Sequence, residues 1–150
     1  MSKPFPLQTL LDLSQKRMDD ATRRLGELLA SEQEATTRLD LLQQYRDEYQ
    51  NRFMDATKNG INRKEIDNYR IFLGRLDDAI GQARQIVEQT KWRTSQGQQD
   101  WLDKRGRVKA FDTLSQRHQT RQNHIENRKE QKLLDEHVTR QFQSTQSHDD

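Results

Sequence analysis

Histidine is the side chain that most often supplies acid–base chemistry or a metal ligand, and this chain has four. His118 and His124 lie six positions apart, so they would not share one face of a helix as two metal ligands four residues apart do. His137 and His148 stand alone further along the chain. There is no Cys, and the six Gly are scattered singly rather than gathered in a phosphate-binding loop. We therefore expect no metal and no cofactor, and interpret the histidines as surface residues.

Carboxylates are numerous, but the 24 Asp and Glu are matched by 26 Lys and Arg, for a net charge of +2. A catalytic carboxylate needs a dry, concave pocket that shifts its pKa. Only 30% of the 150 residues are hydrophobic, too few to fill the interior of a compact α/β or all-β domain of this length. We therefore do not expect an enzyme, and we interpret the mixed charges as a solvated surface.

Large apolar side chains outside the expected core are more informative. Tyr45 and Phe72 each precede a core position, are expected to approach each other, and are predicted to gather with Tyr49, Leu76 and Ala79 near the turn of a helical hairpin. A two-stranded coil cannot fully bury such flanking rings, and an exposed aromatic cluster is typical of a partner-binding surface. The alternative is packing at the edge of the core with no partner.

The elements that must position these residues are long helices. Both prolines, Pro4 and Pro6, lie at the start, so no later residue breaks a helix in the way proline does. The strong interruption is Asn59-Gly60-Ile61-Asn62, where Gly60 suits a helix end and Asn62 can cap a second helix with Glu65 three residues later. We predict a helix over about 8–58, a turn over 59–62, a second helix over about 63–142 and a disordered tail over 144–150.

Each predicted helix carries a heptad repeat of apolar residues. In the first helix the a and d positions are Leu11, Ser14, Met18, Ala21, Leu25, Leu28, Glu32, Ala35, Leu39, Leu42, Arg46, Tyr49, Phe53 and Ala56. In the second helix they are Ile66, Tyr69, Leu73, Leu76, Ile80, Ala83, Val87, Thr90, Thr94, Gly97, Trp101, Lys104, Val108 and Phe111. The exceptions in the second helix cluster between Thr90 and Lys104. Trp92, at an f position, is predicted to be a further exposed aromatic.

A short turn between two such helices predicts an all-α fold, an antiparallel coiled-coil hairpin forming a single elongated domain of about 70 Å. Leu11 is expected opposite Val108–Phe111. The second helix should then project past the first by about 25–30 residues, or about 40 Å. Because isolated helices are marginal in water, we expect the projection to fray when free and to order on a partner.

Several other classes are disfavoured. No apolar run is long enough to span a bilayer, and the first residues lack the apolar core of a signal peptide, so we expect a cytoplasmic protein without direct membrane insertion. Residues 101–132 hold nine Lys and Arg against four Asp and Glu. This excess is small and lacks interleaved stacking aromatics, so no nucleic acid partner is expected.

The chain resembles the FliJ family, the small coiled-coil component of the bacterial flagellar type III export apparatus, in length, early hinge and carboxyl-terminal extension. The matching residues are Leu10, Asp12-Leu13, Asp19-Asp20-Ala21, Leu25-Gly26-Glu27, Tyr45, Glu48-Tyr49, Asn59-Gly60-Ile61, Asn68-Tyr69, Phe72, Leu76, Ala79-Ile80, Trp101, Glu126-Asn127-Arg128, Gln131-Lys132 and Asp135-Glu136.

The resemblance implies a coiled coil similar to the γ stalk of rotary ATP synthases. It implies a non-enzymatic protein of flagellum biogenesis and motility that is a monomer when free and lies at the cytoplasmic face of the inner membrane export apparatus. Its partners would be the hexamer of the export ATPase FliI, the cytoplasmic domain of the export gate protein FlhA, and export chaperones.

The resemblance also implies two partner-binding sites. The site for the export gate would comprise Leu42, Tyr45, Tyr49, Phe72, Leu76 and Ala79. The site for the ATPase would comprise Trp101, Phe111, Asn127, Arg128, Gln131 and Lys132. Arg38 and Ala83 depart from the family pattern, which leads us to expect Gln and a larger polar residue there. A generic coiled-coil tether that homodimerises, and the equivalent stalk of an injection-type secretion system, are the alternative interpretations.

Overall fold

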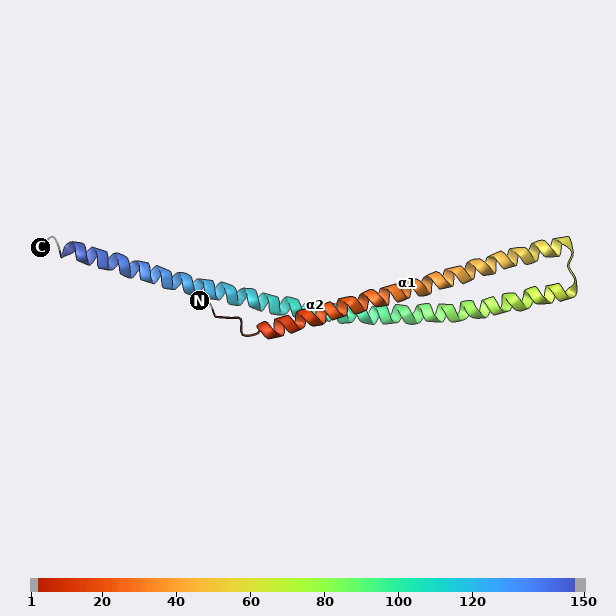
Figure 1. Cartoon of the computed structure of the whole chain (residues 1–150), viewed down its shortest axis with the longest axis horizontal. Helices are drawn as coiled ribbons and strands as arrows, with labels where there is room; N and C mark the ends of the chain where they lie inside the picture. The colour runs from red at the N-terminus through yellow and green to blue at the C-terminus, as the bar shows by residue number, and fades with distance from the viewer. Residues whose placement is uncertain (1–2, 148–150) are drawn as a thin grey trace. The chain divides into compact units, whose positions relative to one another are not determined.

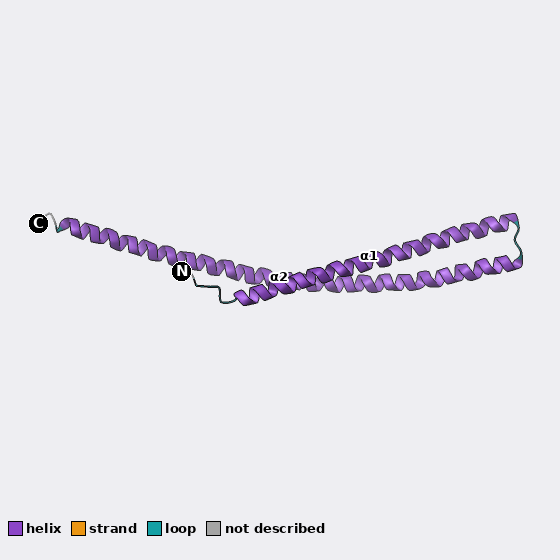
Figure 2. Ribbon diagram, viewed as in Figure 1, coloured by secondary structure: helices purple, strands orange, loops and turns teal. Residues whose placement is uncertain are grey.

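A computed structural model describes residues 3–147 of the chain, and its regular structure consists of two helices (Figures 1 and 2). Helix α1 spans Gln8–Asn59 (52 residues) and helix α2 spans Arg63–Gln146 (84 residues). The described residues contain no strand. The all-α fold class expected from the heptad pattern is therefore confirmed.

The turn between the helices has the local chemistry that its sequence predicts. Gly60 has a φ of 81°, in the left-handed region that favours glycine just past a helix end. Its amide N donates to the Thr57 carbonyl at 3.4 Å. The side-chain oxygen of Asn62 accepts a hydrogen bond from the Glu65 amide at 2.9 Å, which caps α2. These contacts stop α1 and start α2 within three residues.

The described chain divides into two compact units, to which each helix contributes. The hairpin unit consists of Asp19–Asp103, and the terminal unit consists of residues 3–18 and 104–147 of the described chain. In the hairpin unit, the helices run antiparallel from the turn, where the yellow end of α1 meets the start of α2 in Figure 1. In successive contacts between the helices, the residue number falls along α1 and rises along α2. The contacting pairs are Phe53 with Tyr69, Tyr49 with Phe72, Arg46 with Asp77, Leu28 with Thr94, and Thr22 with Trp101.

The predicted heptad positions form the core. Every a and d residue from Leu11 to Ala56 and from Ile66 to Phe111 is buried or half-buried. The most buried side chains among the described residues all belong to the hairpin unit and are Ala21, Leu73, Ile80, Ala83, Val87, Thr90 and Thr94. A two-helix core is one layer deep, so few side chains lose all contact with water.

The region from Thr90 to Lys104, which holds the exceptions to the apolar pattern of the second helix, includes two of the most buried residues. Thr90 is 7% exposed and Thr94 is 4% exposed. Their hydroxyls donate within α2 to the carbonyls of Val87 at 2.8 Å and Thr90 at 2.9 Å, so each of these two buried hydroxyls has a partner. The Thr94 hydroxyl also lies 3.4 Å from the Leu28 carbonyl of α1. Small side chains with satisfied hydroxyls therefore serve as core residues here.

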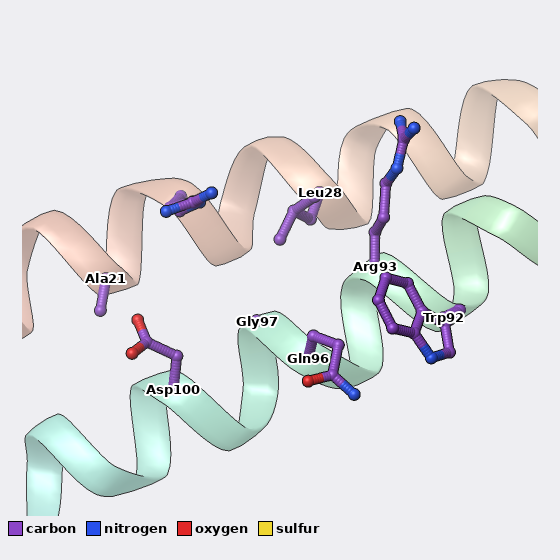
Figure 3. Close-up of a pocket in the computed structure, with 8 residues that line it drawn as sticks. Ala21, Leu28, Trp92, Arg93, Gln96, Gly97 and Asp100 are labelled. Atoms are coloured by element: carbon purple, nitrogen blue, oxygen red, sulfur yellow. The ribbon is translucent and has the colours of Figure 1, made fainter.

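Gly97 lies close to α1 in this region. A Cβ at this position would lie 2.5 Å from Cδ1 of Leu28 on α1, whereas one at Gly26 would have nothing within 4 Å. Figure 3 shows Leu28 directed from α1 toward Gly97. The glycine thus lets α2 come close to α1.

This contrast predicts opposite effects of two substitutions on the free energy of unfolding. Gly97→Leu should lower it by about 1–3 kcal/mol, because a large side chain overpacks the contact with Leu28. Gly26→Ala should raise it by about 0.5–1 kcal/mol, because alanine is the better helix former and meets no obstacle. Thermal and urea unfolding followed by circular dichroism measure both; an unchanged stability of the Gly97→Leu protein would contradict the close packing.

In the terminal unit, the segment before α1 packs on α2 at His118. The rings of Phe5 and His118 lie 5.6 Å apart, and Nε2 of His118 lies 2.9 Å from the Lys3 carbonyl oxygen. Because a carbonyl only accepts, Nε2 is the nitrogen that carries the proton in this contact. His118, expected to be a surface residue, is half-buried by this contact.

Beyond Glu126, every described residue of α2 is exposed. The helix runs to Gln146, so Ser144 to Gln146 continue it where the sequence predicted the start of a disordered tail. Residues 148–150 of that predicted tail lie outside the described residues. That the whole chain behaves as a single domain stays a prediction.

Candidate partner-binding surfaces

The first candidate surface lies in the hairpin unit next to the turn. Phe72 packs on Tyr49 with ring centroids 4.2 Å apart, and Phe53 packs on Tyr69 at 5.4 Å. The guanidinium carbon of Arg52 lies 5.2 Å from the centroid of the Tyr49 ring, within the range of a cation–π interaction. Aromatic pairs of this kind stabilise the end of the hairpin and fix the orientation of the rings that remain partly exposed.

The six residues predicted to bind the export gate all lie on this unit. Tyr45 and Phe72 are exposed (53% and 37%) and the other four, Leu42, Tyr49, Leu76 and Ala79, are half-buried. The sequence predicted that Phe72 would approach Tyr45. In the structure the ring of Phe72 packs on Tyr49, which lies four residues after Tyr45, nearer the connection between the helices. Phe72, at a g position of α2, therefore packs on the d residue Tyr49 of α1.

Sequence reasoning missed part of this surface. A hollow of about 390 Å³ is lined by Tyr49, Ala56, Ile61, Glu65, Asn68, Tyr69 and Phe72. Ile61 comes from the turn itself, where an apolar residue between two asparagines was the available signal. The turn therefore contributes to the apolar surface as well as reversing the chain.

An ion pair joins the two helices in the same unit. Nε of Arg46 donates to Oδ1 of Asp77 at 2.6 Å, joining α1 to α2. This hydrogen bond and the charge of Asp77 raise the pKa of Arg46 above its usual value. The pair explains how a polar residue is tolerated at an a position.

The residues predicted to bind the ATPase are divided between the two units. Trp101 belongs to the hairpin unit, where its Nε1 donates to the Thr22 hydroxyl at 2.9 Å. The other five belong to the terminal unit, and of these Phe111 is half-buried while Asn127, Arg128, Gln131 and Lys132 are exposed. Trp101 therefore has a structural contact of its own, and only the four polar residues lie together on the exposed part of α2.

The exposed part of α2 also carries large apolar side chains. Leu134, Val138 and Phe142 recur every four residues, which places them on one face of the helix, and they are 61–63% exposed. Leu133 beside them is 65% exposed. We call these four residues the terminal apolar face. Phe142 was not singled out from the sequence, although its spacing from Val138 was a signal.

Among the described residues, no group of three or more His, Asp or Glu side chains could hold a metal ion. In the same part of the chain, neither helix has a stretch that is long and apolar enough to cross a membrane.

These features define a coiled-coil protein of two antiparallel helices with partly exposed aromatic and apolar surfaces. The sequence model of the family described as "Flagellar FliJ protein" matches residues 2–147. The chain is also 35% identical to the Flagellar FliJ protein of Escherichia coli (strain K12) over 140 residues, which is 93% of this chain and 95% of that relative. It is 34% identical to the Flagellar FliJ protein of Salmonella typhi over the same length and shares of both chains.

The chain therefore belongs to the FliJ family and is a component of the flagellar protein export apparatus. This confirms the family that the sequence resembles.

Proposed function

We propose that this protein is a non-enzymatic, stalk-like accessory of the export apparatus, which binds the hexameric export ATPase FliI, promotes its assembly and activity, and links it to the export gate and to export chaperones. Its place would be the cytoplasmic face of the inner membrane. The observation that carries the proposal is family membership over nearly the whole chain, combined with apolar surfaces in each unit.

The proposed contact with the ATPase is on the exposed part of α2. Asn127, Arg128, Gln131 and Lys132 offer hydrogen-bond donors and positive charge, and the terminal apolar face follows directly after them. Each of the four large apolar side chains is more than half exposed. Burying them in a partner therefore lowers the free energy of the complex. Helix-in-groove binding of this kind uses side chains spaced by three and four residues.

The proposed contact with the export gate is the aromatic surface near the turn. Tyr and Phe are frequent anchors of protein interfaces, because a rigid ring buries a large area at a small cost in side-chain entropy. Tyr45 and Phe72 have this character, and the contact between Tyr49 and Phe72 holds the second ring in place.

A binding assay with purified partners tests the proposal. The full-length protein should bind the export ATPase and the cytoplasmic domain of the gate protein in separate pull-downs, and should raise the rate of ATP hydrolysis by the ATPase. If the protein fails to bind one or both partners, the proposal is wrong. If it binds both but does not stimulate ATP hydrolysis, its role in ATPase activity is excluded and only its role as a link between the two partners remains.

A homodimeric tether is the second candidate, and the terminal apolar face is the observation that favours it. A dimer formed by this face would bury Leu134, Val138 and Phe142 without any other protein. Light scattering of the free protein decides between the two. The accessory role predicts the mass of a monomer, near 17.9 kDa, at concentrations where a tether would be dimeric.

A further inference from the structure

The connection between the two helices carries a dipeptide with a chemistry of its own. Of the six asparagines in the chain, Asn59 is the one that glycine follows. The carbon of an asparagine side-chain amide can be attacked by the backbone nitrogen of the next residue, and the side chain of that next residue normally obstructs the attack. Gly60 has no side chain, so its nitrogen is open to Asn59. Both residues are exposed, so water reaches them.

The conformation of the turn leaves the Gly60 nitrogen weakly held. Asn59 is the last residue of α1, and Gly60 follows it with a φ of 81°. The Gly60 nitrogen donates to the Thr57 carbonyl at 3.4 Å, beyond the range of about 2.7–3.2 Å in which such hydrogen bonds usually fall. The last carbonyls of a helix have no partner within it, and helix ends fray. The peptide that joins Asn59 to Gly60 can therefore rotate toward the side-chain amide at the cost of this long contact.

The other asparagines lack this combination of features. Asn62 precedes Arg63, and its side-chain oxygen already accepts a hydrogen bond from the Glu65 amide at 2.9 Å. The remaining four lie inside a helix, where the next amide belongs to the helical backbone and the next side chain is large. They are Asn51, Asn68, Asn123 and Asn127.

We propose that Asn59 is a site of spontaneous deamidation, and that its products weaken the binding of the export gate to the adjacent aromatic surface. The effect on binding rests on the proposed function, whereas the modification itself does not. A molecule that has waited long without a partner would then differ chemically from a newly made one.

The reaction needs water as its co-reactant. The Gly60 nitrogen gives up its proton and bonds to Cγ of Asn59, while the bond from Cγ to the side-chain nitrogen breaks and that nitrogen leaves as ammonia. Water then adds to one of the two carbonyl carbons of the resulting cyclic imide and breaks the bond from that carbon to the Gly60 nitrogen. Opening at Cγ gives aspartate, and opening at the main-chain carbonyl gives isoaspartate. An amide and water thus become an acid and ammonia, with no oxidation or reduction.

Both products place a carboxylate at the carboxyl end of α1. This charge is unfavourable, because it lies at the negative end of the helix dipole and four residues after Asp55, on the same face of the helix. In isoaspartate the backbone also runs through Cβ and Cγ, which lengthens the main chain directly before the turn. Ile61, two residues later, lines the hollow of about 390 Å³ together with Tyr49 and Phe72. The modification is therefore expected to displace an apolar side chain of the aromatic surface.

Mass spectrometry of the purified full-length protein, aged by warming at mildly alkaline pH, tests the modification. Trypsin releases residues 59–63 as one peptide, whose mass rises by about 1 Da when an asparagine becomes an acid. Fragmentation of this peptide distinguishes Asn59 from Asn62. Asn59 should be converted at least about tenfold faster than Asn51 or Asn68, because the unhindered attack has the lower barrier. Equal rates at these positions, or no change in mass at Asn59, would overturn the inference.

Calorimetric titration against the cytoplasmic domain of the gate protein tests the consequence. The aged form, separated from the fresh protein by its extra negative charge on an ion exchanger, should bind the gate domain about threefold or more weakly. Asn59→Gln is the matched control, since it keeps the amide but moves it one methylene further along the side chain, which disfavours ring closure. This variant should retain its affinity after ageing. Asn59→Asp adds the charge without lengthening the main chain, so it should lose less affinity than the aged form.

The two measurements separate the two parts of the proposal. If Asn59 is converted but the aged form binds as tightly as the fresh protein, the effect on the gate surface is wrong. If the fresh native protein does not bind the gate domain, the proposed function is wrong, and the mass of the tryptic peptide still decides whether Asn59 is modified.

Discussion

Removal of residues 127–150 is expected to abolish stimulation of the export ATPase while leaving the remaining chain as stable as before. From residue 127 to 147 every described side chain is exposed, so the deletion takes away little buried surface. The Tm measured by circular dichroism should therefore change by no more than a few degrees. ATP hydrolysis by the ATPase should fall to its basal rate at all concentrations of the truncated protein.

Point substitutions distinguish the contribution of the terminal apolar face to stimulation from that of the helix as a whole. Leu134→Glu with Val138→Glu should remove most of the stimulation, because two charges replace apolar side chains that the partner would bury. Gln143→Glu is the control, since it adds a charge nine residues after Leu134, on the other side of the helix. Full stimulation by the truncated protein would contradict an ATPase contact on this part of α2.

The fold was predictable from the sequence to the level of individual core positions. Heptad spacing alone places a residue on the buried stripe of a helix, and the turn is specified locally by Gly60 and Asn62. Thr90, Thr94 and Gly97 were misjudged because a rule based on hydrophobicity ignores size. Where two helices approach closely, a small residue packs better than a large apolar one.

The pairing of side chains was less predictable than their burial. Which α1 ring meets Phe72 depends on the register between the helices, and the register follows from the conformation of the turn and the packing of the whole stripe. The contact between Phe5 and His118 was not foreseen either, because residues before a helix have no periodicity to interpret. The residues that bind a partner are still harder to predict, because their choice depends on the surface of the partner, which the sequence of this chain does not describe.

Substitution of Tyr45 and Phe72 together by alanine is expected to weaken binding to the export gate domain by about 30-fold or more, the effect of losing one strong or two moderate interface anchors. Both side chains are exposed, so the helical content should not change. Some loss of Tm is expected from Phe72→Ala, because its ring packs on Tyr49 at 4.2 Å, whereas Tyr45→Ala should leave Tm unchanged.

The control that isolates the gate contact is a second double variant, which carries Ile71→Ala together with Leu29→Ala. Ile71 is the neighbour of Phe72 in sequence and is 56% exposed, but it points away from the aromatic surface, at an f position. This control removes a similar amount of exposed apolar area and should retain native affinity in calorimetric titrations. Equal losses in the two double variants would mean that general surface hydrophobicity drives the association, and undiminished affinity of the Tyr45 and Phe72 variant would exclude the aromatic surface as the gate site.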